Sequence, residues 1–166
     1  MKQTFLIFSM LVVAAMSVDE NFVERLANGA DMTKEEVMIC VNKTSVTVED
    51  LMHFDQIVVD DLNTIDFDDK ALKAGCLFAC IAKKKGMMTG AHVNIEKVKE
   101  IMNAKAKRGT PDKRAKGFQI LDLCADRVRG KTNECEVTLK FVFCCLHETQ
   151  KYMENDNKND NENDNE

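Results

Sequence analysis

Apolar residues recur along most of the chain at the three- and four-residue spacing of helices, and no valine- or isoleucine-rich run alternates with polar residues as a strand does. Residues that cap helices stand before several of these stretches. They are Thr33-x-x-Glu36, Thr47-x-x-Asp50, Asn94, Thr110-Pro111 and the pair Thr132-Asn133. The pattern predicts an all-α fold of about six helices, without an internal repeat.

Glycines and charged residues set the expected boundaries. A short turn at residues 22–26 is expected to stop at Asn28-Gly29, and an acidic connection is expected at residues 60–69. The helices are expected to begin near residues 33 and 47, and then to span about 68–85, 94–109, 110–129 and 132–152. Three lysines and then Gly86 favour the end of the third helix, because cations and a left-handed glycine suit a helix C-terminus.

The last of these helices has an unusual surface. Apolar residues from Val137 to Leu146 occur all around its circumference. A helix of this kind in a globular protein is surrounded by other helices. The C-terminal helix is therefore expected in the middle of the fold.

The N-terminus reads as a secretory signal at residues 1–17. Lys2 precedes an apolar run from Thr4 to Ala15, and Ala15 and Ser17 are small residues at the cleavage site. This run is too short to span a bilayer, and no later stretch is long enough. The sequence predicts a secreted, extracellular protein whose single domain covers residues 18–153.

The net charge of −5 lies almost entirely in the tail, because residues 154–166 hold six acids against Lys158. The body is therefore close to neutral, and no basic stripe alternates with aromatic residues. This excludes a nucleic-acid binder. The Asn/Asp/Glu tail lacks apolar residues that could be buried, so it is expected to be a disordered, solubilising extension.

The seven cysteines are expected to form disulfides rather than a zinc site, because the chain is exported and its three histidines are scattered. Spacing alone does not choose among the many possible pairings. Cys76 and Cys80 share a helix face, whereas Cys135 and Cys144 lie on opposite sides of the last helix. The last helix can thus be tied to two different neighbours.

The order of cysteines resembles the six-cysteine signature of insect odorant-binding proteins, which include the pheromone- and general odorant-binding proteins. After Cys40 come Cys76-x3-Cys80, Cys124 and Cys135-x8-Cys144. Residues 75–85, GCLFACIAKKK, are similar to the pheromone-binding branch around its second and third cysteines. The match runs from Cys40 to about Leu146.

This resemblance implies the disulfides Cys40–Cys80, Cys76–Cys135 and Cys124–Cys144. Three cross-links would let the helices surround a hollow, apolar cavity. Two features depart from the family: the gap from Cys40 to Cys76 is long, and Cys145 is additional. Cys145 is interpreted as a small buried apolar residue, with an intermolecular disulfide or a reactive thiol as alternatives.

The resemblance also implies which residues line the cavity, although each is equally an ordinary core residue. Positions counted from the cysteines match family cavity positions at five residues, and the second helix and Cys145 add four more. The expected ligand-binding residues are Phe78, Met87, Phe118, Leu121 and Phe141, together with Leu51, Met52, Phe54 and Cys145. Thr89 or Tyr152 could donate a polar contact.

The function that follows is reversible binding of small hydrophobic ligands such as odorants, pheromones or similar lipids, with a chemosensory receptor as a further candidate partner. The protein is expected to be a monomer or weak homodimer without stable membrane insertion. The alternative keeps the fold but makes it a non-olfactory lipophilic carrier or a protein-interaction module.

Some proteins of the pheromone-binding branch insert an apolar C-terminal segment into the cavity at low pH and so displace the ligand. The polar tail of this chain predicts that this mechanism of ligand release is absent.

An enzymatic alternative rests on residues 144–148. They are similar to the Cys-Cys-x-x-His-Asp helix of secreted phospholipases, but His147 comes one residue early and no glycine-rich calcium loop precedes it. We therefore expect no catalytic residues, no cofactor and no metal.

Asn42-Lys43-Thr44 is a glycosylation sequon that its neighbour Cys40 could occlude.

Overall fold

The computed structural model describes residues 20–55, 67–105 and 110–163 of the chain. The predicted all-α class is confirmed for these ranges. The helices are α2 (Glu20–Ala30), α3 (Lys34–Thr44), α4 (Val48–Asp55), α5 (Asp69–Lys84), α6 (Ile95–Lys105), α7 (Pro111–Val128) and α8 (Glu134–Asn163), and the strands are β1 (Met88–Thr89) and β2 (His92–Val93).

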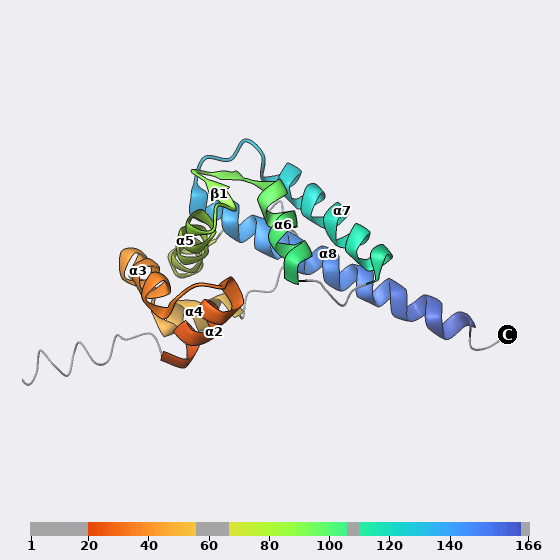
Figure 1. Ribbon diagram of the computed structural model, residues 1–166, viewed down its shortest axis with the longest axis horizontal. Helices are drawn as coiled ribbons and strands as arrows, with labels where there is room; N and C mark the ends of the chain where they lie inside the picture. Colours follow the sequence, from red (N-terminus) through yellow and green to blue (C-terminus); the bar gives the residue numbers. More distant parts are fainter. Residues whose placement is uncertain (1–19, 56–66, 106–109, 164–166) are drawn as a thin grey trace, which may run out of the picture.

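The N-terminal helices α2, α3 and α4 lie together beside α5 (Figure 1). The predicted short turn at residues 22–26 is wrong, because α2 continues through Gly29 to Ala30. Val23 and Ala27 lie one turn apart on α2 and are both 3% exposed in the core between these helices. This burial outweighs the roughly 1 kcal/mol that a glycine costs inside a helix.

The capping residues act as the sequence predicts. The Thr33 hydroxyl accepts a hydrogen bond from the Glu36 backbone N–H at 3.2 Å, and the Glu36 carboxylate accepts one from the Thr33 N–H at 2.9 Å. Asn94 and Thr110 cap α6 and α7 through backbone N–H groups three residues on. The Asn133 amide oxygen accepts two backbone hydrogen bonds at the start of α8, so Asn133 rather than Thr132 is the cap.

A small antiparallel hairpin between α5 and α6 was not expected from the sequence. Met88 pairs with Val93 and Thr89 with His92, and Gly90 takes a positive φ of 55° in the turn. Each strand has only two residues, which is too short for an alternating pattern to be recognised.

Helix α8 is the longest element, and only its first half is enclosed. This half packs against α5 and α7, and Val137 and Leu139 are fully buried, as predicted for a central helix. The second half projects away from the other helices (Figure 1). Leu146 is 58% exposed, so the predicted all-round burial ends before this residue.

The predicted end of the last helix near Tyr152 is also wrong, since α8 runs to Asn163. The expected boundary after residue 153 and the expected disorder of the tail stay predictions. No proline or glycine follows Tyr152 to stop the helix, and extending an existing helix needs only one hydrogen bond per added residue. The solubilising role of the acidic tail stays a prediction.

The buried apolar residues of the described ranges form four separate clusters rather than one continuous core. The largest joins α2, α3, α4 and α5 around Val37 and Leu77. A second stacks Phe67 on Phe143, with ring centroids 5.7 Å apart. The other two lie along α8, on the sides of Val137 and Cys144.

Candidate ligand-binding site

Three disulfides hold the helices in place, and all three predicted pairings are confirmed. Cys40–Cys80 joins α3 to α5, Cys76–Cys135 joins α5 to α8, and Cys124–Cys144 joins α7 to α8, with Cα separations of 5.7, 4.3 and 5.6 Å. Helix α8 is thus tied to two neighbours, as the opposite directions of Cys135 and Cys144 predict. These bonds fix the spacing of the four helices that they connect.

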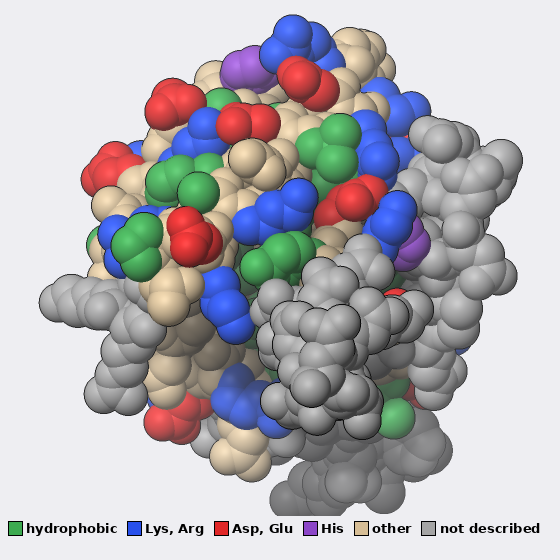
Figure 2. Space-filling model, turned by 90° about the vertical axis from the view of Figure 1, so that its right-hand side faces the viewer, with side chains coloured by type: hydrophobic (Ala, Val, Ile, Leu, Met, Phe, Trp, Pro, Cys, Tyr) green, Lys and Arg blue, Asp and Glu red, His purple; other side chains and the backbone are tan. Residues whose placement is uncertain are grey.

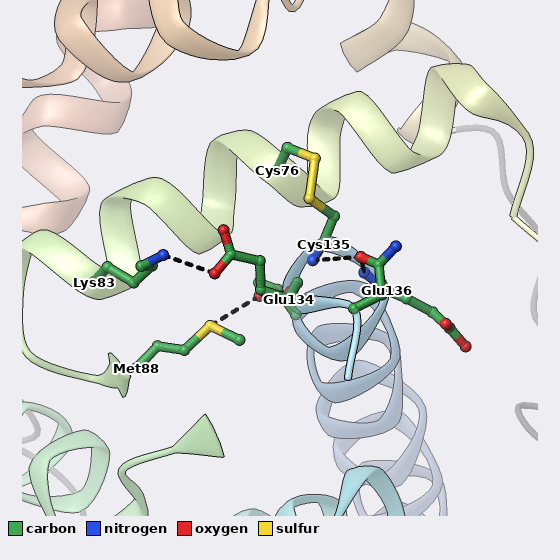
Figure 3. Close-up of polar contacts among 8 residues, drawn as sticks. Cys76, Lys83, Met88, Glu134, Cys135 and Glu136 are labelled. Carbon is green, nitrogen blue, oxygen red and sulfur yellow. Dashed lines mark hydrogen bonds and ion pairs between the residues drawn. A yellow bond between two sulfur atoms is a disulfide. The ribbon is translucent and has the colours of Figure 1, made fainter. Parts of the chain in front are cut away.

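The Cys76–Cys135 bond lies at the closest approach of two helices. Figure 3 shows Cys76 on α5 reaching the first turn of α8, where Lys83 also points to Glu134. The Lys83 Nζ atom lies 2.6 Å from the Glu134 Oε2 atom. Gly75 permits this approach, because a Cβ there would lie 2.5 Å from the Cys135 carbonyl oxygen and 2.6 Å from Leu139 Cγ.

Several large apolar side chains are half-buried on the helices that the disulfides connect. Phe78 on α5, Met87 after it, Phe118 on α7 and Phe141 on α8 all belong to this class. Helix α6 adds an apolar face on which Ile95, Val98, Ile101 and Met102 are likewise half-buried. Phe78 packs against the N-terminal cluster around Val37 and Leu77, so it does not share a cluster with Phe141.

Phe141 occupies a bridging position. It packs against the cluster of Met88, Val128 and Val137 and also against the cluster of Ile120, Cys124 and Cys144. Cys145 lies one turn further along α8 and packs against the cluster of Ile120, Cys124 and Cys144. It is a free thiol, and burial raises its pKa to about 12. This agrees with the interpretation of Cys145 as a small apolar residue.

The remaining predicted ligand residues lie in different surroundings. Leu121 is 8% exposed on α7, and Leu51 is 6% exposed in the N-terminal cluster. Met52 is 58% exposed, so it has no enclosed surroundings among the described residues. The Phe54 side chain lies outside the described residues. The ligand-binding role of all nine residues stays a prediction.

Lys99 is a polar neighbour of Phe118 that the sequence analysis missed. Its ammonium on α6 lies 2.6 Å from the Asp122 carboxylate on α7 and 6.0 Å from the centre of the Phe118 ring. The hydrogen bond to Asp122 raises the Lys99 pKa. The sequence shows that Glu96 and Lys99 are three residues apart on one helix. It does not show that Asp122 on α7 also pairs with Lys99, because the two residues lie on different helices.

The described residues also form open grooves on the surface. One of about 630 Å³ lies between the hairpin and the end of α7 and includes Thr89. Another of about 410 Å³ lies between α7 and α8 beside Tyr152, whose ring is 5.9 Å from the Lys116 ammonium. Neither is lined by Phe118 or Phe141, so the enclosed cavity itself stays a prediction.

One face of the molecule shows how apolar and charged side chains are mixed on the surface (Figure 2). On the face in Figure 2, hydrophobic side chains form separate patches among charged ones. None of the described helices has the length and hydrophobicity needed to cross a membrane. In the same ranges, no group of three or more histidine, cysteine or acidic residues is arranged to hold a metal ion.

Comparison with known proteins gives a consistent result. Residues 23–162 match the model of the PBP/GOBP family. The chain is 26% identical over 142 residues to pheromone-binding protein Gp-9 of Solenopsis globularia littoralis, covering 86% of each chain. It is 24% identical over 140 residues to Gp-9 of Solenopsis richteri, covering 84% of this chain and 87% of the relative. No solved structure gives a significant match. With its helices, its three disulfide pairings and this match over most of its length, the chain belongs to the PBP/GOBP family.

Proposed function

We propose that this protein is an extracellular carrier that reversibly binds small hydrophobic ligands, such as odorants, pheromones or similar lipids, in an internal cavity. The observation that carries the proposal is the set of half-buried aromatic side chains Phe78, Phe118 and Phe141 on disulfide-linked helices. Family membership and the names of the Solenopsis relatives support it. Secretion follows from the predicted signal at residues 1–17, which lies outside the described residues.

Apolar burial supplies enough free energy for such binding. An aliphatic ligand that loses about 350 Å² of apolar surface gains on the order of 9 kcal/mol. The loss of ligand freedom and the ordering of side chains reduce this gain, which leaves roughly micromolar affinity. Methionines such as Met87 and Met102 add flexible, polarisable lining that can adapt to ligands of different shapes.

The proposal can be tested by fluorescence displacement. A long-chain aliphatic alcohol should displace a fluorescent apolar probe such as N-phenyl-1-naphthylamine from the mature protein. Phe118→Ala and Phe141→Ala each remove an aromatic wall and should weaken binding about tenfold, which corresponds to roughly 1.4 kcal/mol.

Matched controls lie on the same two helices. Leu123 on α7 is 41% exposed and Leu146 on α8 is 58% exposed. Leu123→Ala and Leu146→Ala should leave the affinity unchanged, provided that circular dichroism shows all four variants folded. Equal weakening by all four substitutions, or no binding by the unmodified protein, would contradict the carrier proposal.

A second candidate is a protein-interaction module of the same fold. The observation in its favour is the exposed apolar set on α7 and α8, which comprises Leu123, Leu146 and Met153. If this were the function, Leu146→Ala would weaken capture of a partner protein, and apolar ligands would not compete. A non-olfactory lipophilic carrier would give the same displacement result, and the tissue of expression would distinguish it.

A further inference from the structure

The glycosylation sequon Asn42-Lys43-Thr44 lies on helix α3, and none of its residues is among the predicted ligand-binding residues. Asn42 lies in the last turn of α3 and is exposed to solvent. It belongs to the one Asn-x-Ser/Thr triplet in the sequence, with Lys43 between it and Thr44. Helix α3 lies at the opposite end of the molecule from the C-terminus of α8 (Figure 1), so a large group there would not obstruct the projecting second half of α8.

We propose that Asn42 carries an N-linked glycan, which covers the exposed apolar side chain of Ile39. Because the modification occurs only in the secretory pathway, this rests on the secretion that the proposed function includes. In the reaction, the Asn42 amide nitrogen bonds to C1 of the first sugar of a lipid-pyrophosphate-linked oligosaccharide. The bond from C1 to the pyrophosphate oxygen breaks, the amide loses one proton, and the lipid pyrophosphate leaves.

The folded structure would hinder this transfer, but the order of synthesis removes the obstacle. In the fold, Cys40 is bonded to Cys80, and the Thr44 hydroxyl donates a hydrogen bond to the Cys40 carbonyl at 2.9 Å. Cys80 is synthesised 40 residues after Cys40. An 11-residue helix such as α3 is marginally stable alone. The sequon therefore enters the secretory compartment before the Cys40–Cys80 bond can form.

The neighbourhood of Asn42 gives an independent reason for a covering group. Ile39 is 55% exposed, which is high for an isoleucine, and it lies three residues before Asn42 on the same helix face. Ile39 lines a groove of about 530 Å³ between α3, α5 and the start of α8, together with Lys43 and Thr44. The apolar face of a sugar ring attached at Asn42 can lie on Ile39, and its hydroxyls can face the lysines of this groove.

The experiment is secretion of the full chain, signal included, from insect cells. Intact mass is measured before and after peptide-N-glycosidase F, and peptide mapping identifies the residue that becomes aspartate. The expected result is secreted protein with a glycan mass that the enzyme removes, and conversion at residue 42. Asn42→Gln and Thr44→Ala should both abolish the added mass. Thr44→Ser keeps the sequon and the hydroxyl, and should retain it.

Two other outcomes overturn the proposal in distinguishable ways. Protein that reaches the medium without the added mass overturns glycosylation and leaves the carrier function intact. Protein that stays in the cell without the added mass overturns both glycosylation and secretion. The covering of Ile39 is tested by thermal unfolding: deglycosylation should lower the melting temperature less in Ile39→Ser than in the unmodified chain. An equal shift in both would show that the glycan does not cover Ile39.

Discussion

Asp50 shows how one buried carboxylate links the local cap of α4 to the stability of the fold. It is 2% exposed, and its Oδ2 accepts hydrogen bonds at 2.9 Å from both the backbone N–H and the hydroxyl of Thr47. The Lys73 ammonium on α5 lies 3.7 Å away. Burial raises the pKa of the carboxyl, but these donors outweigh it and leave the pKa below its ordinary value.

The first prediction concerns the acid stability that Asp50 contributes. Because its folded pKa is depressed, its contribution is complete above about pH 4 and disappears as the pH falls towards the folded pKa. Asp50→Asn should cost roughly 1–2 kcal/mol at pH 7 and show a smaller loss of stability than the unmodified protein between pH 5 and pH 2. Urea unfolding across this range measures it. Parallel pH profiles for the two proteins would contradict this role.

The second prediction concerns the free thiol of Cys145. Burial raises its pKa from 9.0 to about 12, so at pH 8 its thiolate fraction is about a thousandfold lower than that of an ordinary thiol. Ellman's reagent should therefore react slowly with the native protein and at once in guanidinium chloride. If Cys145 lines the ligand site, a bound aliphatic alcohol should slow the native reaction further. Immediate labelling of the native protein would show that the thiol is exposed.

At the scale of elements, the contact between α5 and α8 depends on the missing side chain of Gly75. A methyl group there would meet the backbone of Cys135 and the Leu139 side chain at distances that real Cβ atoms do not adopt. Gly75→Ala should therefore destabilise the protein by about 1–3 kcal/mol, because the two helices must separate while the neighbouring disulfide resists.

Gly29 supplies the matched control for this third prediction. It also lies within a helix, but a Cβ built there meets nothing within 4 Å. Gly29→Ala should therefore stabilise the protein by up to about 1 kcal/mol. Thermal unfolding of both variants measures the difference. Equal effects of the two substitutions would contradict the close approach of α5 and α8.

The sequence predicted elements well where the determinants were local. The capping patterns at Thr33, Thr47 and Thr110 were read correctly because the donor and acceptor lie within one turn of each other. Helix α2 was underestimated because its stability comes from packing of Val23 against other helices. The Lys99–Asp122 pair was missed because the two residues belong to different helices.

At the scale of the whole molecule, the disulfide framework could be predicted only through the family resemblance. Spacing alone left the pairing of Cys40, Cys76 and the others open, whereas the family pattern gave all three bonds correctly. The length of α8 was not predictable, because its Asn/Asp/Glu composition favours disorder and no local signal marks its continuation to Asn163. The predicted cavity residues were chosen by the same resemblance and await a binding test.

The fourth prediction is that the C-terminal tail does not control ligand release. Residues 154–166 carry six acids and no apolar side chain, so their insertion into an apolar site would be strongly unfavourable. A chain truncated after Glu154 should bind an aliphatic alcohol with the same affinity as the full chain at both pH 7 and pH 5. Calorimetric titration of the two proteins tests this. Tighter binding by the truncated chain at pH 5 alone would indicate tail-driven ejection.

The central claim is that disulfide-linked helices enclose one apolar ligand site. Native mass spectrometry of the secreted protein, titrated with a long-chain aliphatic alcohol, tests it most directly. The predicted result is a single bound alcohol per chain at micromolar concentration, in a protein that retains three disulfides and one free thiol. Binding should be lost when the disulfides are reduced. Absence of a complex, or several alcohols bound with equal affinity before and after reduction, would contradict an enclosed site.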